Sequence, residues 1–238
     1  MATAEDGWEG ELKYRRALTI MAIQYEVRTC GPDPAEKHPM GGFPQVCYIK
    51  NTVRHTRIQI GDYTYYADLD NSVDFELNVL YLSPLLDDKL IIGKFCAIAC
   101  GVKFIMNGAN HPLSGFSTYP FFAFGNGWEK VQPEISEHPT RGDTVIGNDV
   151  WIGYESLIMP GVRVGNGAIV ASRSVVASDI DAYTIAGGNP ARPIKKRFSD
   201  EVITELQQLG WWDWPVERIT RNLEAIVSGD IEALRGCL

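Results

Sequence analysis

The sequence has too few histidines and cysteines for the commonest metal and disulfide chemistries. It has only 4 His in 238 residues, and no two of them share a short motif. This argues against a zinc site, which on a repetitive β fold would need several His ligands. The 5 Cys are odd in number and form no C-x-x-C pair, so we expect reduced cysteines that serve as small core residues. We therefore expect a cytoplasmic protein without a bound metal.

Long apolar runs and an excess of basic charge are also missing. The longest apolar window near the start, residues 17–23, is far shorter than the roughly 20 residues that a membrane span needs. Acidic residues precede this window and no small-residue cleavage pattern follows it, which argues against a signal peptide. The chain has 22 Lys and Arg against 30 Asp and Glu, whereas nucleic-acid binders usually carry a basic face. We expect neither a membrane nor a nucleic acid as a partner.

Common catalytic motifs are absent as well. The sequence contains no G-x-S-x-G, no Walker A motif and no G-x-G-x-x-G between a strand and a helix, so it offers no support for a nucleophilic serine or a nucleotide loop. Its hydrophobic content of 45% and aromatic content of 11% exclude a disordered chain. The sequence predicts a folded globular protein whose chemistry rests on other residues.

What the sequence does contain is a six-residue repeat between residues 146 and 181. Aliphatic side chains recur at every sixth position: Ile146, Ile152, Ile158, Val164, Val170 and Val176. A period of six matches neither a helix nor a single strand. It fits a triangular coil with three short strands per turn, whose successive turns pair as parallel strands. Ile92, Ile98 and Phe104 have the same spacing and extend the coil toward the N-terminus.

The repeat is interrupted twice, between residue 65 and about residue 84 and again between residues 107 and 142. Long loops in compact domains are usually functional or disordered, and the second interruption is too rich in aromatics for disorder. We expect three parts: an N-terminal extension (1–30), a coil (31–190) with an excursion loop at about 107–142, and a C-terminal helical segment (191–238). Ser199 is the expected cap of one helix, and Pro215 the start of another.

One histidine, His111, lies in a turn sequence where the second interruption begins. Residues 107–112 read NGANHP, a composition typical of tight turns, and they follow a predicted coil strand. An imidazole has an ordinary pKa near 6.5, so a neutral histidine is a natural general base. On spacing alone, a loop histidine that only holds its turn together is an equally good interpretation.

Several longer motifs resemble one enzyme family. They are GDYTYY at 61–66, DKLIIGKFCAI at 88–98, FIMNGANH at 104–111, STYPF at 117–121, FGNGWEK at 124–130, GDTVIGNDVWIG at 142–153, GGNPA at 187–191 and WWDWP at 211–215. Together they resemble the xenobiotic acetyltransferases, the hexapeptide-repeat family of streptogramin A acetyltransferases and type B chloramphenicol acetyltransferases. The resemblance covers roughly residue 31 to the C-terminus. Its most specific part is NGANH combined with STYPF.

The resemblance implies a fold dominated by β structure: a left-handed parallel β-helix with a long excursion loop and C-terminal α-helices. It implies a homotrimer with active sites between neighbouring subunits. It also implies acetyl-CoA as co-substrate, no metal, and a small-molecule acceptor with a hydroxyl group. His111 would be the general base that takes the hydroxyl proton while the oxygen attacks the thioester directly, without an acetyl-enzyme.

Seven residues are candidates for acetyl-CoA binding: Trp151, Ala171, Ala177, Asn189, Pro190, Lys195 and Lys196. The resemblance places Trp151 beside the pantetheine arm, although an outward tryptophan can also fill a seam between subunits. Small residues on later coils would let an extended ligand lie close to the backbone. The two lysines belong to the only dense basic cluster of the chain, which could bind the CoA phosphates or be a solvated surface patch.

Five residues are candidates for the acceptor site: Tyr65, Tyr81, Ser83, Asn110 and Phe121. Tyr65 matches a drug-pocket tyrosine of the family. Two departures are visible. Ser83 stands where streptogramin A enzymes have an aromatic residue, and the loop after His111 has the length of the chloramphenicol branch.

We expect an acetyl-CoA-dependent O-acetyltransferase that inactivates an antibiotic, with streptogramin A as the first candidate acceptor. Chloramphenicol, or a sugar or cell-envelope hydroxyl, is an alternative acceptor. A β-helix that only binds a partner, without catalysis, is the alternative from another functional class.

Overall fold

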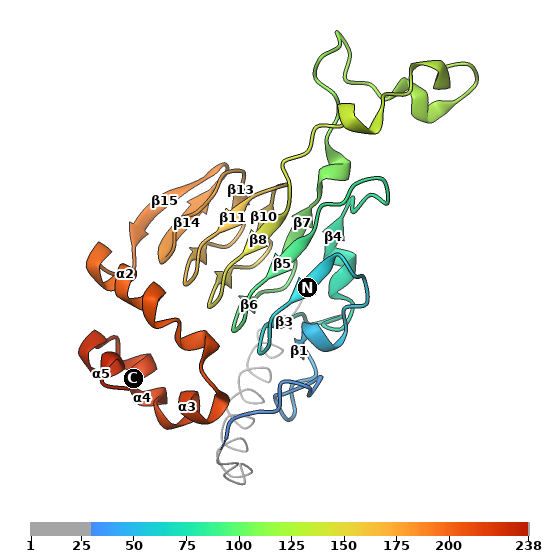
Figure 1. The fold of residues 1–238 in the computed structure, drawn as a ribbon. Coiled ribbons are helices and arrows are strands. Elements are labelled where there is room, and N and C mark those ends of the chain that lie inside the picture. The colour runs from blue at the N-terminus through green and yellow to red at the C-terminus, as the bar shows by residue number, and fades with distance from the viewer. Residues whose placement is uncertain (1–29, 238) are drawn as a thin grey trace, which may run out of the picture.

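The computed structural model describes residues 30–237, and within them the chain winds through three sheets in turn (Figure 1). The first sheet contains β2 (Ile58–Ile60), β5 (Leu90–Ile92), β8 (Thr144–Ile146) and β11 (Arg163–Val164). The second contains β3 (Tyr65–Ala67), β6 (Ala97–Ile98), β9 (Trp151–Ile152), β12 (Ile169–Val170) and β14 (Thr184–Gly188). The third contains β4 (Val79–Leu80), β7 (Lys103–Ile105), β10 (Leu157–Ile158) and β13 (Val175–Val176). Strands of successive coils pair in parallel within each sheet.

The predicted repeat is confirmed at the level of single residues. Each aliphatic residue of the six-residue series points into the coil and is at most 2% exposed: Ile146, Ile152, Ile158, Val164, Val170 and Val176. The earlier series behaves in the same way, since Ile92 is 2% exposed and both Ile98 and Phe104 are fully buried. One inward side chain per short strand is enough to fill a narrow coil. The core is therefore a column of aliphatic layers.

The corners of the coil recur with the same regularity. The residues that turn the chain from the first sheet to the second have positive φ angles at Tyr63, Phe95, Asp149, Gly167 and Tyr183. Gly167 is required at its corner, because a Cβ atom there would lie 2.4 Å from Cε1 of the Tyr183 ring. Stacking of these corners keeps the coils in register.

The first interruption is divided in two by a coil strand that the sequence did not predict. Strand β4 lies inside the predicted gap and pairs with β7, with Val79 opposite Phe104. The sequence pattern missed this coil face because Val79 is out of phase with the six-residue series that begins at Ile92, and because the face directly follows the 3₁₀ helix η2 (Phe75–Asn78). The chain therefore departs from the coil over 68–78, and again over 81–89.

The second sheet is extended by an antiparallel strand at each edge. Strand β1 (Val46–Tyr48) pairs with β3, and β15 (Ala191–Lys196) pairs with β14. The boundary predicted at residue 190 thus falls inside the β14–β15 hairpin, because the Gly-Gly-Asn-Pro sequence reverses the strand instead of ending the sheet. The helical part of the C-terminal segment begins only at Asp200.

Four α-helices follow the sheet: α2 (Asp200–Leu209), α3 (Val216–Arg221), α4 (Leu223–Ser228) and α5 (Ile231–Arg235). Ser199 caps α2 as predicted, since its hydroxyl oxygen accepts from the Val202 backbone N–H. The pattern after Pro215 predicted one helix, but a non-helical residue at Asn222 divides it into two. The remaining 3₁₀ turns are η1 (Ile49–Asn51), η3 (Asn107–Ala109), η4 (Phe121–Phe124), η5 (Glu129–Val131), η6 (Ile135–Glu137) and η7 (Trp211–Asp213).

The helices pack on the corner between the first and second sheets. Trp212 and Leu234 are buried there together with Tyr183, and the ring of Trp211 lies 5.1 Å from that of Phe95. Aromatic packing thus joins the helices to the coil. None of the helices within residues 30–237 combines the length and the apolarity that crossing a bilayer requires. The N-terminal extension lies outside the described residues, except for Cys30.

Candidate active site

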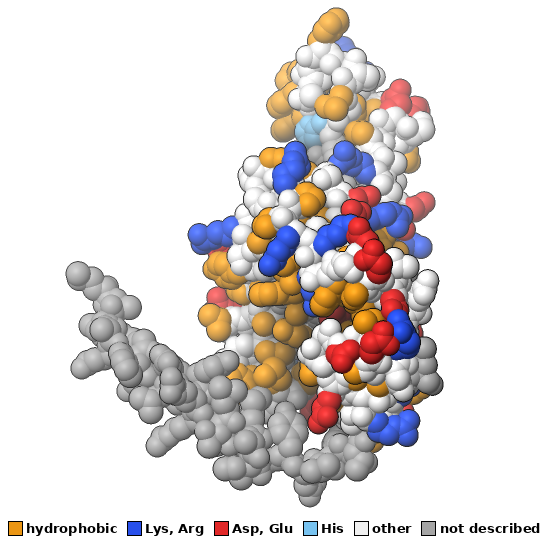
Figure 2. Space-filling view, turned by 90° about the vertical axis from the view of Figure 1, so that its left-hand side faces the viewer, with side chains coloured by type: hydrophobic (Ala, Val, Ile, Leu, Met, Phe, Trp, Pro, Cys, Tyr) orange, Lys and Arg blue, Asp and Glu red, His pale blue; other side chains and the backbone are white. Residues whose placement is uncertain are grey.

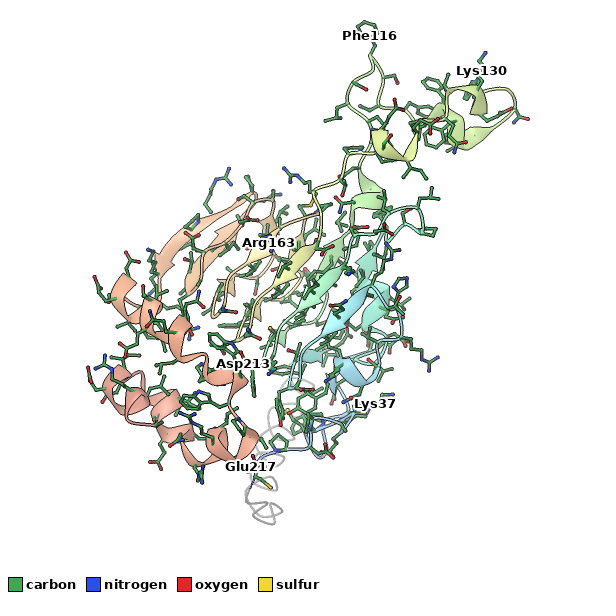
Figure 3. The ribbon with its side chains drawn as sticks, viewed as in Figure 1. Lys37, Phe116, Lys130, Arg163, Asp213 and Glu217 are labelled. Carbon is green, nitrogen blue, oxygen red and sulfur yellow. The ribbon has the colours of Figure 1, made fainter. Side chains whose placement is uncertain are left out.

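The excursion leaves the coil at the corner between the third and first sheets. It starts after β7 and returns at β8, and in Figure 1 it extends well beyond the coil. Phe116 lies at its far end and is fully exposed (Figure 3). Aromatic rings pack on one another within the excursion: the ring centre of Tyr119 lies 4.8 Å from that of Phe121 and 5.1 Å from that of Phe124. The candidate acceptor residue Phe121 thus belongs to a small aromatic cluster on the excursion and is 39% exposed.

His111 is held at the base of this excursion by one hydrogen bond. Its Nδ1 atom lies 2.6 Å from the carbonyl oxygen of Thr118. A carbonyl oxygen can only accept, so Nδ1 carries the proton and the other ring nitrogen, Nε2, has a free lone pair when the ring is neutral. The side chain is exposed. This is the arrangement that a general base needs: one nitrogen oriented and one nitrogen available.

The turn before His111 is held by two asparagines. The Nδ2 group of Asn110 donates to the side-chain oxygen of Asn107 (3.2 Å) and to the carbonyl oxygen of Pro139 (2.9 Å). Both amide hydrogens of Asn110 are therefore used inside the protein. If Asn110 contacts an acceptor molecule as predicted, only its side-chain oxygen is available to do so.

The same turn lies directly on the segment that contains Tyr81 and Ser83. A Cβ atom at Gly108 would lie 2.3 Å from the carbonyl oxygen of Tyr81 and 2.9 Å from the Cβ atom of Ser83. Only glycine allows this approach. The structure thus brings together three of the predicted acceptor residues, Tyr81, Ser83 and Asn110, at the turn that precedes His111. Ser83 packs against the turn, whereas Tyr81 is 62% exposed.

Tyr65 and Trp151 are not brought to His111 within one chain. They lie in one row on the outer face of the second sheet, because Tyr65 pairs with Ala97 and Ala97 pairs with Trp151. That sheet is opposite the corner from which the excursion leaves. Burial raises the pKa of the Tyr65 hydroxyl, so this group stays protonated at neutral pH and can donate a hydrogen bond.

The two small residues predicted near the cofactor occupy different corners. Ala171 follows β12 at the corner between the second and third sheets, and its Cβ atom would lie 2.9 Å from a Cβ atom at Gly187. Ala177 follows β13 at the corner between the third and first sheets. Because Val176 is in register with Ile158 and Phe104, Ala177 is on the same corner as the start of the excursion.

The predicted basic cluster is divided by the structure. Lys195 pairs with Ile185 in the β14–β15 hairpin and Lys196 pairs with Thr184, so the two lysines point to opposite faces. Lys196 also forms an ion pair with Asp200, and this hydrogen bond raises the pKa of Lys196. The turn residues Asn189 and Pro190 are exposed at the end of the same hairpin.

Arg197, the next residue of that cluster, is already engaged inside the protein. Its guanidinium donates to the carbonyl oxygen of Gly167 (2.6 Å) and lies 3.6 Å from the Asp149 carboxylate. It borders a cavity of about 460 Å³ between the C-terminal helices and the coil. This cavity is at a different corner from His111. Within the described part of the chain, no three His, Cys, Asp or Glu side chains are grouped as a metal site requires.

Comparison with known proteins gives concordant matches. The model of the bacterial transferase hexapeptide (six repeats) matches residues 143–178. The chain is 49% identical over 205 residues to the virginiamycin A acetyltransferase of Staphylococcus aureus, covering 86% of this chain and 93% of the relative. It is 43% identical to a chloramphenicol acetyltransferase of Escherichia coli, covering 78% and 90%. It is 59% identical to a probable macrolide acetyltransferase of Lysinibacillus sphaericus, covering 63% and 84%. The chain belongs to the xenobiotic acetyltransferases of the hexapeptide-repeat type.

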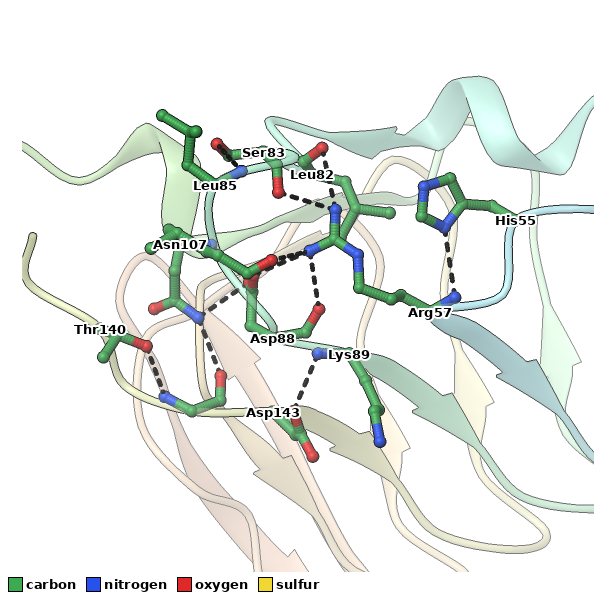
Figure 4. A network of polar contacts seen from close by, with 12 residues as sticks. His55, Arg57, Leu82, Ser83, Leu85, Asp88, Lys89, Asn107, Thr140 and Asp143 are labelled. Atoms are coloured by element: carbon green, nitrogen blue, oxygen red, sulfur yellow. Dashed lines mark hydrogen bonds and ion pairs between the residues drawn. The ribbon is translucent and has the colours of Figure 1, made fainter. Parts of the chain in front are cut away.

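This xenobiotic acetyltransferase contains a network of buried and half-buried polar residues to which the sequence assigned no role. Arg57, Asp88 and Asn107 form a hydrogen-bonded network directly beneath the His111 turn (Figure 4). Asp88 and Asn107 both lie within family motifs, so the motifs marked them without showing what they contact. Arg57 lies outside those motifs, and no pattern in the sequence pointed to it.

Proposed function

We propose that this acyltransferase uses acetyl-CoA to acetylate a hydroxyl group of an antibiotic, with virginiamycin A as the first candidate acceptor. The observation that carries the proposal is the His111 hydrogen bond, which leaves Nε2 free as a base. The relative named virginiamycin A acetyltransferase matches over most of both chains. A module that only binds a partner would have no use for an oriented imidazole at the base of an excursion.

The proposed reaction needs a general base and an attack of the acceptor hydroxyl on the thioester. Nε2 of His111 removes the proton of the acceptor hydroxyl while the hydroxyl oxygen bonds to the acetyl carbonyl carbon. When the tetrahedral intermediate collapses, the C–S bond breaks and the CoA thiolate takes a proton from the imidazolium. The Thr118 carbonyl keeps its hydrogen bond to Nδ1–H throughout and stabilises the imidazolium, because a charged donor strengthens that bond. No acetyl-enzyme is formed.

A macrolide is the second candidate acceptor, favoured by the 59% identity to a protein described as a probable macrolide acetyltransferase. Virginiamycin A and macrolides are both large rings that carry hydroxyl groups. A large apolar acceptor fits a site bordered by exposed aromatic side chains such as Tyr81 and Phe121. Chloramphenicol is favoured only by the length of the loop after His111 and by relatives of lower identity.

We further propose that the coil is a left-handed β-helix and that the protein is a homotrimer with its sites between subunits. His111 and the Tyr65–Trp151 row lie on opposite sides of one chain, so a site that uses both needs two copies. The excursion supports this, because Leu113 is 80% exposed and Ile135 is 58% exposed in the single chain. Figure 2 shows apolar side chains on the excursion and Lys and Arg side chains on the body just below it. Apolar surface of this kind is usually covered by a partner.

In this arrangement the excursion of one subunit covers the second sheet of the next. Trp151, Ala171, Ala177, Asn189, Pro190 and Lys195 would lie along the path of acetyl-CoA, while Tyr65, Tyr81, Ser83, Asn110 and Phe121 would border the acceptor. Both ligands would then meet at His111.

The proposal is tested with an acceptor panel in an assay of free-thiol release from acetyl-CoA. The panel contains virginiamycin A, a macrolide, chloramphenicol and maltose, and the His111→Ala variant is the control for uncatalysed hydrolysis. We expect kcat/KM to be highest for one of the two macrocycles. A large preference for the sugar would exclude the antibiotic as acceptor, and no thiol release with any acceptor would exclude the enzyme activity.

A further inference from the structure

A buried side chain, Asn107, joins the start and end of the excursion, in addition to the hydrogen bond from Asn110 to the Pro139 carbonyl. Asn107 is 1% exposed and is the first residue after the coil. Its Nδ2 group donates to the carbonyl oxygen of Gly142 (2.8 Å), and its side-chain oxygen accepts from the Arg141 backbone N–H (2.8 Å). Residues 107 and 141–142 are where the chain leaves the coil and returns to it. The Asn107 amide therefore holds together the two ends of the excursion at the point where they meet the coil.

The same side chain is anchored to the coil through Asp88. One oxygen of the Asp88 carboxylate accepts two hydrogen bonds from Asn107, from the backbone N–H and from Nδ2, both at 2.9 Å (Figure 4). Asp88 is 5% exposed, and its other oxygen lies 3.5 Å from the guanidinium of Arg57. A buried carboxylate is stable only when it is paired and hydrogen-bonded in this way.

Arg57 and Asn110 connect this anchor to the site. The Arg57 guanidinium also donates to the carbonyl oxygen of Ser83 (2.7 Å), which fixes the segment on which the His111 turn lies. On the other side, Asn110 donates to the oxygen of Asn107 (3.2 Å). His111 is the next residue. The network thus connects the Arg57–Asp88 ion pair to the backbone of the proposed base.

We infer that Asn107 is a positioning residue that sets the place of His111 by closing the base of the excursion onto Asp88; this inference rests on the proposed function. Within the excursion no strand pairs with the coil, so its direction is decided at its two ends. A base must be held close to its productive position, since a misplacement of about 1 Å can cost about 100-fold in rate. The Asn107 amide provides that constraint.

The test compares Asn107→Ala and Asn107→Asp with a matched control, Thr64→Val. Thr64 is also fully buried, donates from Oγ1 to the Gly93 carbonyl (2.6 Å) and accepts from the Cys96 N–H (3.0 Å). It stabilises the corner between the first and second sheets, a different corner from the one at which the excursion of the same chain leaves. We expect both Asn107 variants to lower kcat by about 30-fold or more with the dissociation constant of CoA unchanged, and Thr64→Val to lower the melting temperature with kcat unchanged.

A reciprocal exchange provides the rescue. Asn107→Asp alone places two carboxylates together, whereas the Asp88→Asn/Asn107→Asp pair restores a donor opposite an acceptor. We expect the double variant to have a higher kcat than Asn107→Asp. Trypsin cleavage after Lys130, an exposed residue of the excursion, supplies a readout independent of catalysis. It should be faster in Asn107→Ala than in Thr64→Val.

The outcomes separate the inference from the function on which it rests. An active wild type whose Asn107→Ala variant keeps kcat, losing only thermal stability as Thr64→Val does, would overturn the positioning role. A wild type that releases no thiol with any acceptor would overturn the proposed function instead, and the trypsin comparison would then still decide whether Asn107 orders the excursion. Unchanged cleavage in Asn107→Ala would count against the inference in either case.

Discussion

The Nδ1 atom of His111 lies 2.6 Å from the carbonyl oxygen of Thr118, and this contact closes the first loop of the excursion on itself. The imidazole is therefore oriented by the backbone and needs no carboxylate partner. The contact joins the motif STYPF, which contains Thr118, to the motif NGANH, which contains the proposed base His111.

Replacing His111 by alanine should remove the base and leave the fold intact, because the side chain is exposed. We expect kcat to fall by about 10²–10⁴, equivalent to about 3–5 kcal/mol, with an unchanged melting temperature. His111→Asn retains a side-chain donor but has no base, so it should be equally inactive. His138→Ala, at another histidine of the excursion, is the control. Retention of most of the turnover in His111→Ala would remove His111 from the mechanism.

Sites shared between subunits can be detected by mixing inactive variants. His111→Ala and Trp151→Ala homotrimers should each be nearly inactive. After joint refolding, about one site in four should combine an intact His111 from one chain with an intact Trp151 from another, restoring about a quarter of the wild-type activity. Light scattering should give the mass of a trimer. No recovery in the mixture, or an active monomer, would contradict a site at the seam.

The two lysines of the β14–β15 hairpin should differ in their effect on the cofactor. Lys196 is paired with Asp200, whereas within residues 30–237 no ion pair involves Lys195, which is on the outer side of the sheet with Ile185. We expect Lys195→Ala to raise KM for acetyl-CoA several-fold with kcat unchanged, and Lys196→Ala to have little effect. Equal KM values for wild type and Lys195→Ala would assign Lys195 to the solvated surface.

Asp149 should make the stability of the protein depend on pH. Burial raises the pKa of its carboxyl, and the Arg197 charge opposes this only in part. Because the folded pKa is above the unfolded one, the stability that Asp149 contributes is present at low pH and is lost as the pH rises through the folded pKa. Asp149→Asn removes that loss, and asparagine tolerates the positive φ angle of 56° found there.

We therefore expect the difference in melting temperature, Asp149→Asn minus wild type, to be more positive at pH 7 than at pH 4. The exposed Asp87 is the control, and Asp87→Asn should shift the melting temperature by similar amounts at both pH values. A larger advantage for Asp149→Asn at pH 4 would mean that the ion pair with Arg197 outweighs the cost of burial.

Much of the fold could be predicted from the sequence because the coil is a local pattern. One aliphatic residue in every six is enough to specify an inward side chain on each face, and Ile146 through Val176 are buried as that pattern requires. One coil face could not be predicted, because the chain departs from the coil on both sides of it. In the strand Val79–Leu80, the buried residue Val79 is out of phase with the six-residue series that begins at Ile92, and the partner of this strand is β7, more than twenty positions away in the sequence.

The sequence by itself determined the repeat, the place of the excursion, and the presence of His111 in a turn at its start, since each depends on residues that are near one another along the chain. Only the tertiary structure decided which candidates share a location. It placed Ser83 beneath Gly108, put Tyr65 and Trp151 on the opposite side of the coil, separated Lys195 from Lys196, and joined Asn107 to Gly142. The physical reason is that such contacts depend on how coils stack and where the chain returns, and residues far apart in sequence carry no periodic record of that.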